Sequence, residues 1–227
     1  MAAIVLLMGV QTVVYVAMWV ATAVHRNSKP NLSNLITGDS VSVASLLSAP
    51  VVFGFIWKMA ALRRPYPVRD YLGLRPFTVR QAAEGVGALG LLLALLTVIN
   101  HWVHQPPNAI MLDIFRTATV APLLWLVIVV VVPIYEELVF RGFLVQGLSR
   151  SRIGPWGAVI AASAGWTAIH SQYGIFECSE LFVLGLILGW LRVRTGSIWP
   201  AVIVHAVNNG LASLMIVLLL EGKIRVE

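Results

Sequence analysis

The chain has 227 residues, of which 59% are apolar and only 11% are charged. Its mean hydropathy is +0.85, whereas a soluble domain carries roughly 45 to 50% apolar and about 25% charged residues. These proportions exclude a soluble globular fold, because such a fold needs polar side chains to cover its core. The sequence therefore predicts an integral membrane protein.

The net charge of +6 does not indicate a nucleic-acid partner. The 16 basic residues fall almost entirely in short segments between apolar runs, whereas nucleic-acid recognition needs a basic patch interleaved with aromatic side chains on a polar surface. The single cysteine, Cys178, excludes an internal disulfide and a thiol-based zinc or redox motif. The fold must be held together by packing alone.

The apolar runs predict about seven membrane-spanning helices, since a helix that crosses a bilayer needs about 20 apolar residues. In chain order, the candidate spans are residues 2–24, 41–62, 82–103, 120–148, 155–170, 180–191 and 198–220. The first run lacks a basic amino-terminal region and is too long for a signal peptide, so we expect it to be retained. The fold class is therefore all-α, a polytopic transmembrane helix bundle in a single integral-membrane domain, residues 1–227.

The basic residues also predict an orientation, because short cytoplasmic loops are enriched in Lys and Arg. Three connections are arginine-rich, and all three lie on one side if the count of seven spans is correct. The opposite connections carry only Arg26, Lys29 and Arg116. We therefore expect the amino terminus inside and the carboxyl terminus outside, although Lys223 and Arg225 oppose this. The arginine-rich connections hold Arg63, Arg64, Arg69, Arg75 and Arg80, then Arg150 and Arg152, then Arg192 and Arg194.

Two adjacent carboxylates, Glu136 and Glu137, lie deep within the span 120–148. Polar groups in hydrocarbon are costly, so those that remain there are functional candidates. On a helix Glu137 and Arg141 share a face and can pair, while Glu136 points about 100° away. One interpretation is a structural ion pair, with Glu136 bonded to a neighbouring helix. The other is a catalytic carboxylate.

Two later spans carry further polar groups. His170 ends the fifth span, and His205 and Asn209 lie one turn apart on the seventh. Measured from the cytoplasmic ends at 1.5 Å per residue, Glu136 lies at roughly 18 Å depth, His170 at roughly 21 Å, His205 at roughly 11 Å and Asn209 at roughly 17 Å. We therefore expect these side chains to share one polar cavity.

Such a cavity holds the groups that hydrolysis needs. A carboxylate can take a proton from water, an imidazole can orient that water, and a second imidazole with an amide can stabilise an oxyanion. The set Glu136, His170 and His205 is also a conceivable zinc site, but no His-Glu-x-x-His motif favours metal. We therefore expect no cofactor, with zinc as the alternative. The remaining histidines, His25, His101 and His104, lie at span ends or in loops, and we interpret them as solvated.

Three motifs occur in order on the late helices: Glu136-Glu137-x-x-x-Arg141, Trp166-x-x-x-His170 and His205-x-x-x-Asn209. Together they resemble the CPBP family of intramembrane proteases, also called the Abi or type II CAAX prenyl endopeptidase family. The resemblance covers residues 120–220, which it marks as a catalytic core. It implies that Glu136 and His170 activate water, that His205 and Asn209 form the oxyanion site, and that Glu137 and Arg141 complete the first motif. Trp166 stands where the family usually has Phe, a substitution that keeps a large aromatic wall, and the resemblance implies a supporting role for it.

The resemblance implies an endopeptidase that cuts a membrane-anchored protein or peptide, with or without a lipid group, in or beside the membrane. The compact chain and its short loops favour a bacterial plasma membrane. Two other classes explain the buried charge: a proton-coupled transporter with a relay through the glutamates and histidines, and a non-catalytic scaffold or immunity protein. No inverted repeat supports transport. Substitution of Glu136 by Gln separates an enzyme from a scaffold.

Overall fold

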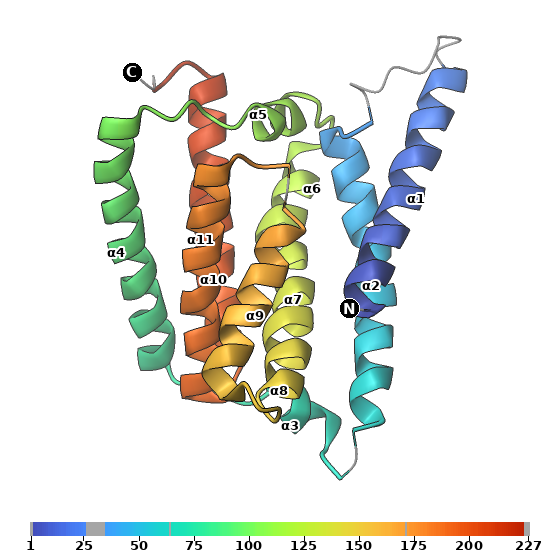
Figure 1. Ribbon diagram of the computed structural model, residues 1–227. Helices are drawn as coiled ribbons and strands as arrows, with labels where there is room; N and C mark the ends of the chain where they lie inside the picture. The colour runs from blue at the N-terminus through green and yellow to red at the C-terminus, as the bar shows by residue number, and fades with distance from the viewer. Residues whose placement is uncertain (1, 26–34, 64, 171, 225–227) are drawn as a thin grey trace. The chain divides into compact units, whose positions relative to one another are not determined.

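The computed structural model describes residues 2–25, 35–63, 65–170 and 172–224. These residues form helices and connections without any strand, which confirms the all-α class (Figure 1). Two stretches of π-helix, η2 and η3, interrupt the helical run 121–148. The elements are α1 (Ala2–His25), α2 (Gly38–Ala61), α3 (Val68–Leu72), α4 (Val79–Val103), α5 (Ala109–Arg116), α6 (Ala121–Leu126), η2 (Val127–Val131), α7 (Val132–Glu137), η3 (Leu138–Leu144), α8 (Val145–Leu148), α9 (Gly154–Ala168), α10 (Ile175–Thr195) and α11 (Trp199–Leu220).

Four helices in the described part of the chain are long and apolar enough to cross a membrane: α2, α4, the run Ala121–Leu148, and α11. They make this an integral membrane helix bundle. The two predicted spans before α11 differ from expectation. α9 ends at Ala168 after 15 residues, about 22 Å at 1.5 Å per residue, whereas α10 has 21 residues rather than the short span predicted over 180–191. The count of seven spans stays a prediction.

The chain divides into two compact units, each built from separated segments. Unit 1 comprises Met1–Phe55, Pro106–Val132 and Asn209–Glu227, and unit 2 comprises Ile56–Gln105 and Pro133–Asn208. The helices α2, 121–148 and α11 contribute residues to both units. The predicted orientation residues Arg26, Lys29, Arg64 and Arg225 lie outside the described residues.

Within unit 1, the start of α2 is fixed to the connection that follows α5. The carboxylate of Asp39 accepts hydrogen bonds from the backbone N–H and hydroxyl of Thr119, at 2.9 and 3.0 Å. At Gly38 a Cβ atom would overlap the carbonyl of Ile114 and the side chain of Ala118, so the backbone approach there requires glycine. The eight-residue helix α5 was not predicted, because its apolar run is too short to stand out from a loop.

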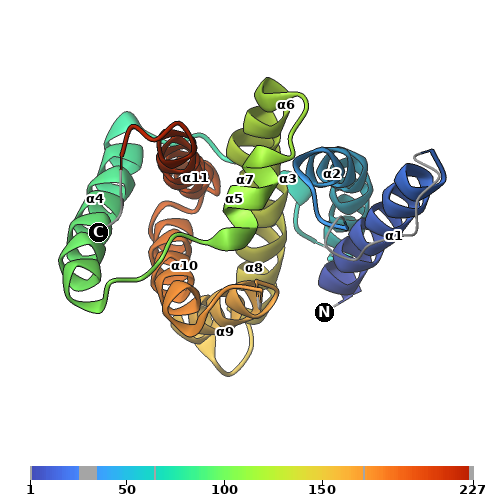
Figure 2. The ribbon, with the colours of Figure 1, turned by 90° about the horizontal axis from the view of Figure 1, so that it is seen from above.

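Unit 2 is built around α9 and α10, which pack side by side beside the α7–α8 region (Figure 2). A Cβ atom on Gly185 would lie 2.9 Å from Cβ of Ser163, and one on Gly189 would lie 2.5 Å from Cγ1 of Val159. The spacing of these glycines predicts close helix packing, and the structure confirms it. α4 packs against the other side of α10, where Gly85 faces Leu191.

We expect Gly189→Ala to destabilise the protein by about 1–3 kcal/mol, because the added methyl group overfills the contact with Val159. Gly90→Ala on α4 is the matched control, since a Cβ there meets nothing within 4 Å, and replacing a helical glycine by alanine stabilises a helix by roughly 0.5–1 kcal/mol. Denaturant unfolding in detergent measures both. Equal stability of the two variants would contradict the packing argument.

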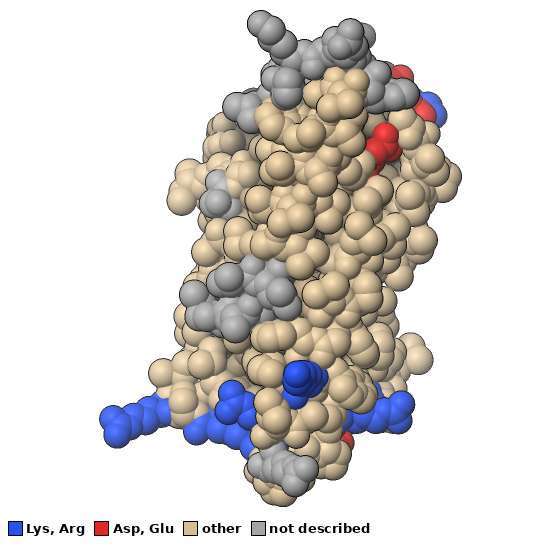
Figure 3. Space-filling view, turned by 90° about the vertical axis from the view of Figure 1, so that its right-hand side faces the viewer, with Lys and Arg blue, Asp and Glu red and all other residues tan. Residues whose placement is uncertain are grey.

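The three arginine-rich connections meet at one end of unit 2. Arg194 and Arg80 both pair with Glu84, at 3.0 and 3.1 Å, and the hydroxyl of Ser197 donates to the carbonyl of Arg75 at 2.8 Å. Arg150 lies over the ring of Tyr66 at 3.7 Å. These contacts confirm that the three connections share one side. In Figure 3 the Lys and Arg side chains of the face in view gather mainly at its lower end.

Candidate active site

The paired glutamates lie on α7, a short α-helical segment between two π-helical segments. A π turn bonds residue i to i+5 and is frequently found at functional sites. Pro133, at the second position of α7, has no N–H and so cannot continue the ladder of backbone hydrogen bonds. The helix therefore changes its winding on both sides of Glu136 and Glu137. The exposed fractions of the two residues are only 5% and 0%.

Glu137 is the centre of a buried charge network in unit 2. Its Oε1 atom accepts a hydrogen bond from Nη1 of Arg141 at 2.8 Å, which confirms the predicted ion pair. The same oxygen lies 3.0 Å from Nδ1 of His205 on α11. A carboxylate oxygen only accepts, so Nδ1 of His205 carries the proton in this contact. Glu137 therefore fixes the orientation of one of the predicted site histidines.

Arg141 is fully buried and is held from three directions. Besides Glu137, its Nη2 atom donates to the carbonyl of Gly185 at 3.2 Å, and its guanidinium lies 4.8 Å from the ring centroid of Trp166. A buried cation requires such compensation by charge, acceptors and aromatic faces. The first motif is thereby connected to α9 and α10 as well as α11.

Glu136 bonds to a neighbouring helix through Trp166 on α9. The indole Nε1 of Trp166 donates to Oε2 of Glu136 at 2.7 Å. That same oxygen lies 3.9 Å from Nε2 of His205. The sequence assigned Trp166 only a supporting role as an aromatic wall, because a hydrogen bond between separate helices leaves no trace in residue spacing. The structure makes Trp166 the donor that orients Glu136.

The predicted span 155–170 ends at His170, whereas α9 ends at Ala168, so His170 lies just beyond the helix. Its Nδ1 atom lies 2.8 Å from the carbonyl of Trp166, so Nδ1 carries the proton here too. The Trp166 ring packs edge-on against both histidines, with centroid separations of 5.3 Å to His170 and 5.2 Å to His205. In the neutral form, both histidines thus carry their lone pair on Nε2.

Tyr173 is a site neighbour that the sequence did not single out. It stacks on His170 with ring centroids 5.8 Å apart, and it lies in the turn between α9 and α10. Burial, reinforced by the negative charges of Glu136 and Glu177, raises the pKa of Tyr173 to about 12. Its phenol therefore stays protonated at neutral pH. Its position three residues after His170 is the one feature of the sequence that could have indicated Tyr173 as a site neighbour.

The predicted oxyanion residue Asn209 follows His205 by one turn of α11 and belongs to unit 1. Its Nδ2 atom donates to the carbonyl of Ile128 at 3.0 Å. Ile128 lies in η2. In a π-helix its carbonyl would accept a hydrogen bond from the N–H five residues later, at position 133. Pro133 has no N–H and leaves this carbonyl without that donor. Asn209 thus supplies a donor at the irregular turn. An oxyanion role for Asn209 stays a prediction.

The other singled-out residues lie away from this cluster. His101 and His104 are exposed at the end of α4, as expected, and His25 ends α1, with its side chain outside the described residues. Cys178 precedes the predicted span 180–191 but lies within α10, because that helix begins earlier than its hydropathy indicates. Its thiol lies 3.6 Å from the carbonyl of Tyr173.

The zinc alternative needs Glu136, His170 and His205 to converge on one point. Within the part of the chain that the structure describes, no three His, Cys, Asp or Glu side chains are grouped so that they could hold a metal ion. A metal-free site therefore stays a prediction.

Comparison with known proteins connects this region to one protease family. Residues 118–211 match the family model "Type II CAAX prenyl endopeptidase Rce1-like". The match contains all three motifs and confirms the predicted family resemblance. A protein of Escherichia coli described as an "Uncharacterized 24.3 kDa protein" is 28% identical over 125 residues, which are 53% of this chain and 57% of that protein. The chain thus spans little more than half the length of this relative. No solved structure matches.

Proposed function

We propose, from the match of residues 118–211 to the Rce1-like family, that this protein is a CAAX-type intramembrane endopeptidase that uses Glu136 and histidine to activate water. The observation that carries the proposal is the position of His205 between the two glutamates. Its Nδ1 bonds to Glu137 at 3.0 Å while its Nε2 lies 3.9 Å from Glu136. A water molecule at hydrogen-bond distance from both Nε2 and Oε2 fits this separation.

In the proposed reaction, Glu136 takes one proton from this water as the water oxygen attacks the carbonyl carbon of the substrate. The C–O bond forms, and the carbonyl oxygen becomes an oxyanion. When the C–N bond breaks, the proton held by Glu136 passes to the leaving amine, so the carboxylate is regenerated. The Nε2 atoms of His205 and His170 orient the water, since the Nδ1 atom of each ring is engaged elsewhere.

The hydrogen bond to Glu137 favours a water-orienting role for neutral His205, because Nε2 then accepts rather than donates. The implied oxyanion site would therefore depend on Asn209, or on a protonated His205. The substrate class that we propose is a peptide or protein anchored in the membrane, with a prenyl or other lipid group as one form of anchor. We propose a bacterial plasma membrane as its location.

The test is cleavage of a membrane-anchored peptide library by purified protein in lipid, with and without a zinc chelator. We expect cleavage that survives chelation, because the proposed water is activated by protein groups alone. Loss on chelation with recovery on adding zinc would overturn the metal-free mechanism and keep the protease. No cleavage of any peptide would overturn the proposed function and favour a proton-coupled transporter or a scaffold.

We expect Trp166→Phe to lower kcat/KM by roughly 10- to 100-fold, because a hydrogen bond to a charged group is worth about 1.5–3 kcal/mol. Phenylalanine keeps the aromatic contact with both histidines but removes the donor to Glu136. Trp156→Phe is the control, since Trp156 is an exposed residue on the same helix. Steady-state cleavage rates measure both variants. Unchanged kinetics in Trp166→Phe would show that the hydrogen bond does not position Glu136 for catalysis.

A further inference from the structure

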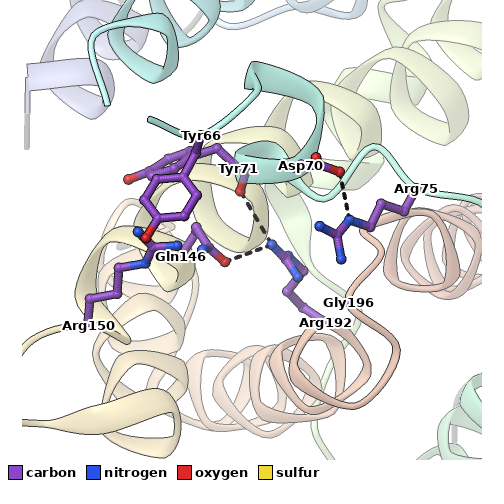
Figure 4. Close-up of a pocket in the computed structure, with 8 residues that line it drawn as sticks. All are labelled: Tyr66, Asp70, Tyr71, Arg75, Gln146, Arg150, Arg192 and Gly196. Carbon is purple, nitrogen blue, oxygen red and sulfur yellow. Dashed lines mark hydrogen bonds and ion pairs between the residues drawn. The ribbon is translucent and has the colours of Figure 1, made fainter. Parts of the chain in front are cut away.

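A second polar site lies in unit 2, where α3, α8 and the end of α10 meet. It is a cavity of about 180 Å³ whose lining includes Arg75, Arg150 and Arg192 (Figure 4). This space suits a phosphate group better than a whole lipid or peptide.

The charges around this cavity are not balanced. Its one lining carboxylate, Asp70, is paired with Arg75 at 2.9 Å. Within the described residues, no carboxylate lies within ion-pair distance of Arg150 or Arg192. The lining therefore carries three arginines against one aspartate. An anion in this space would be attracted by the two cations that lack a carboxylate partner.

Arg192 is held in the wall of the cavity by neutral acceptors. Its exposed fraction is 6%, and its guanidinium donates to the carbonyl of Arg141 at 3.2 Å and to the side-chain oxygen of Gln146 at 3.1 Å. Gly73 makes the approach possible, since its φ is 71° and a Cβ there would lie 2.7 Å from Cζ of Arg192. Burying a guanidinium without a counter-charge costs free energy, so Arg192 in this position lowers the stability of the fold.

Arg150 completes the site from the other side. It stacks over the ring of Tyr66 at 3.7 Å, and Figure 4 shows this pair beside Gln146. Stacking on an aromatic face holds a guanidinium in place while its N–H groups remain able to donate to an anion. The cavity lies at the arginine-rich end of unit 2, which the distribution of basic residues predicts to be cytoplasmic. Basic pockets between membrane helices on that side bind phosphorylated head groups.

We propose that this arginine-lined cavity binds a phosphate group, supplied by an anionic lipid head group or by a soluble phosphate. This goes beyond peptide hydrolysis. Arg192 links the cavity to the active site, because its Nε donates to the carbonyl of Arg141, whose side chain holds Glu137. A bound phosphate should therefore also stabilise the buried charge network.

The test is titration of the purified full chain in detergent with short-chain phosphatidylglycerol, phosphatidylcholine or inorganic phosphate, followed by calorimetry. We compare wild type with Arg150→Gln and with Arg152→Gln. Both side chains are exposed on the same connection, but only Arg150 lines the cavity. We expect Arg150→Gln to raise the Kd for phosphatidylglycerol by about tenfold or more, as expected for losing one charge-assisted hydrogen bond, and Arg152→Gln to change it by less than about twofold.

The ligand arms identify the source of the phosphate. Binding of phosphatidylglycerol that inorganic phosphate cannot reproduce would support a lipid head group, whereas saturable binding of inorganic phosphate that Arg150→Gln weakens would support a soluble anion. Equal weakening by Arg150→Gln and Arg152→Gln would overturn the site in favour of diffuse attraction to a basic surface. Binding of phosphatidylglycerol that Arg150→Gln leaves unchanged would overturn it as well, whatever the affinity for phosphatidylcholine, whose head group also carries a phosphate.

Discussion

Glu136→Gln should abolish most peptide cleavage while leaving the fold intact. A positioned general base contributes typically 10²- to 10⁴-fold to a rate, so we expect a loss of kcat in that range. The amide oxygen of glutamine can still accept the indole N–H of Trp166, which now bonds to Glu136 at 2.7 Å. The unfolding midpoint should therefore change little. Cleavage rates and denaturant unfolding of the same preparation measure the two effects separately.

Glu180→Gln is the control for this prediction. Glu180 is a half-buried carboxylate on α10 that takes no part in the charge network around Glu137. It should keep wild-type cleavage, so that a loss seen only in Glu136→Gln belongs to the site. A Glu136→Gln variant that cleaves at more than about a tenth of the wild-type rate would fall outside the range for a general base and refute that role for Glu136.

Much of the candidate active site could be predicted because its parts are local in sequence. The pairing of Glu137 with Arg141 follows from their four-residue spacing, and the close approach at Gly185 and Gly189 follows from a small-residue pattern. The order of the three motifs indicated a resemblance to the family whose model matches residues 118–211. Each of these inferences needs only the periodicity of one helix or the order of residues along the chain.

The contacts between helices were beyond sequence reasoning. Nothing in residue spacing shows that His205 bonds to Glu137 or that Trp166 donates to Glu136, because these pairs are 68 and 30 positions apart. The π-helical turns were also missed, since hydropathy cannot distinguish them from α-helix. Pro133 was the only local sign of them. The early start of α10 was also missed, because the charge of Glu177 is typical of a loop between spans. In the structure its carboxylate accepts a hydrogen bond from the N–H of Gly174 and so caps the start of the helix.

The largest loss of stability should come from removing only one of the two charged side chains of the Glu137–Arg141 pair. We expect Arg141→Met to cost about 3–5 kcal/mol, because it leaves a fully buried carboxylate without its cation. The matched control is Arg80→Gln, which breaks an ion pair with Glu84 in which the arginine is 87% exposed. Exposed pairs contribute about 0–1 kcal/mol. Denaturant unfolding in detergent compares the two.

The double variant Glu137→Gln with Arg141→Met shows whether the cost comes from the unpaired charge. It removes both charges, so it should lose less stability than the sum of the two single variants, with a coupling of roughly 0.5–3 kcal/mol. Additive losses would mean that Arg141 stabilises the fold mainly through the carbonyl of Gly185 and the ring of Trp166. The amide oxygen of glutamine can still accept a hydrogen bond from Nδ1 of His205, so cleavage by the double variant, compared with its stability, separates the buried charge of Glu137 from its role in orienting the histidine.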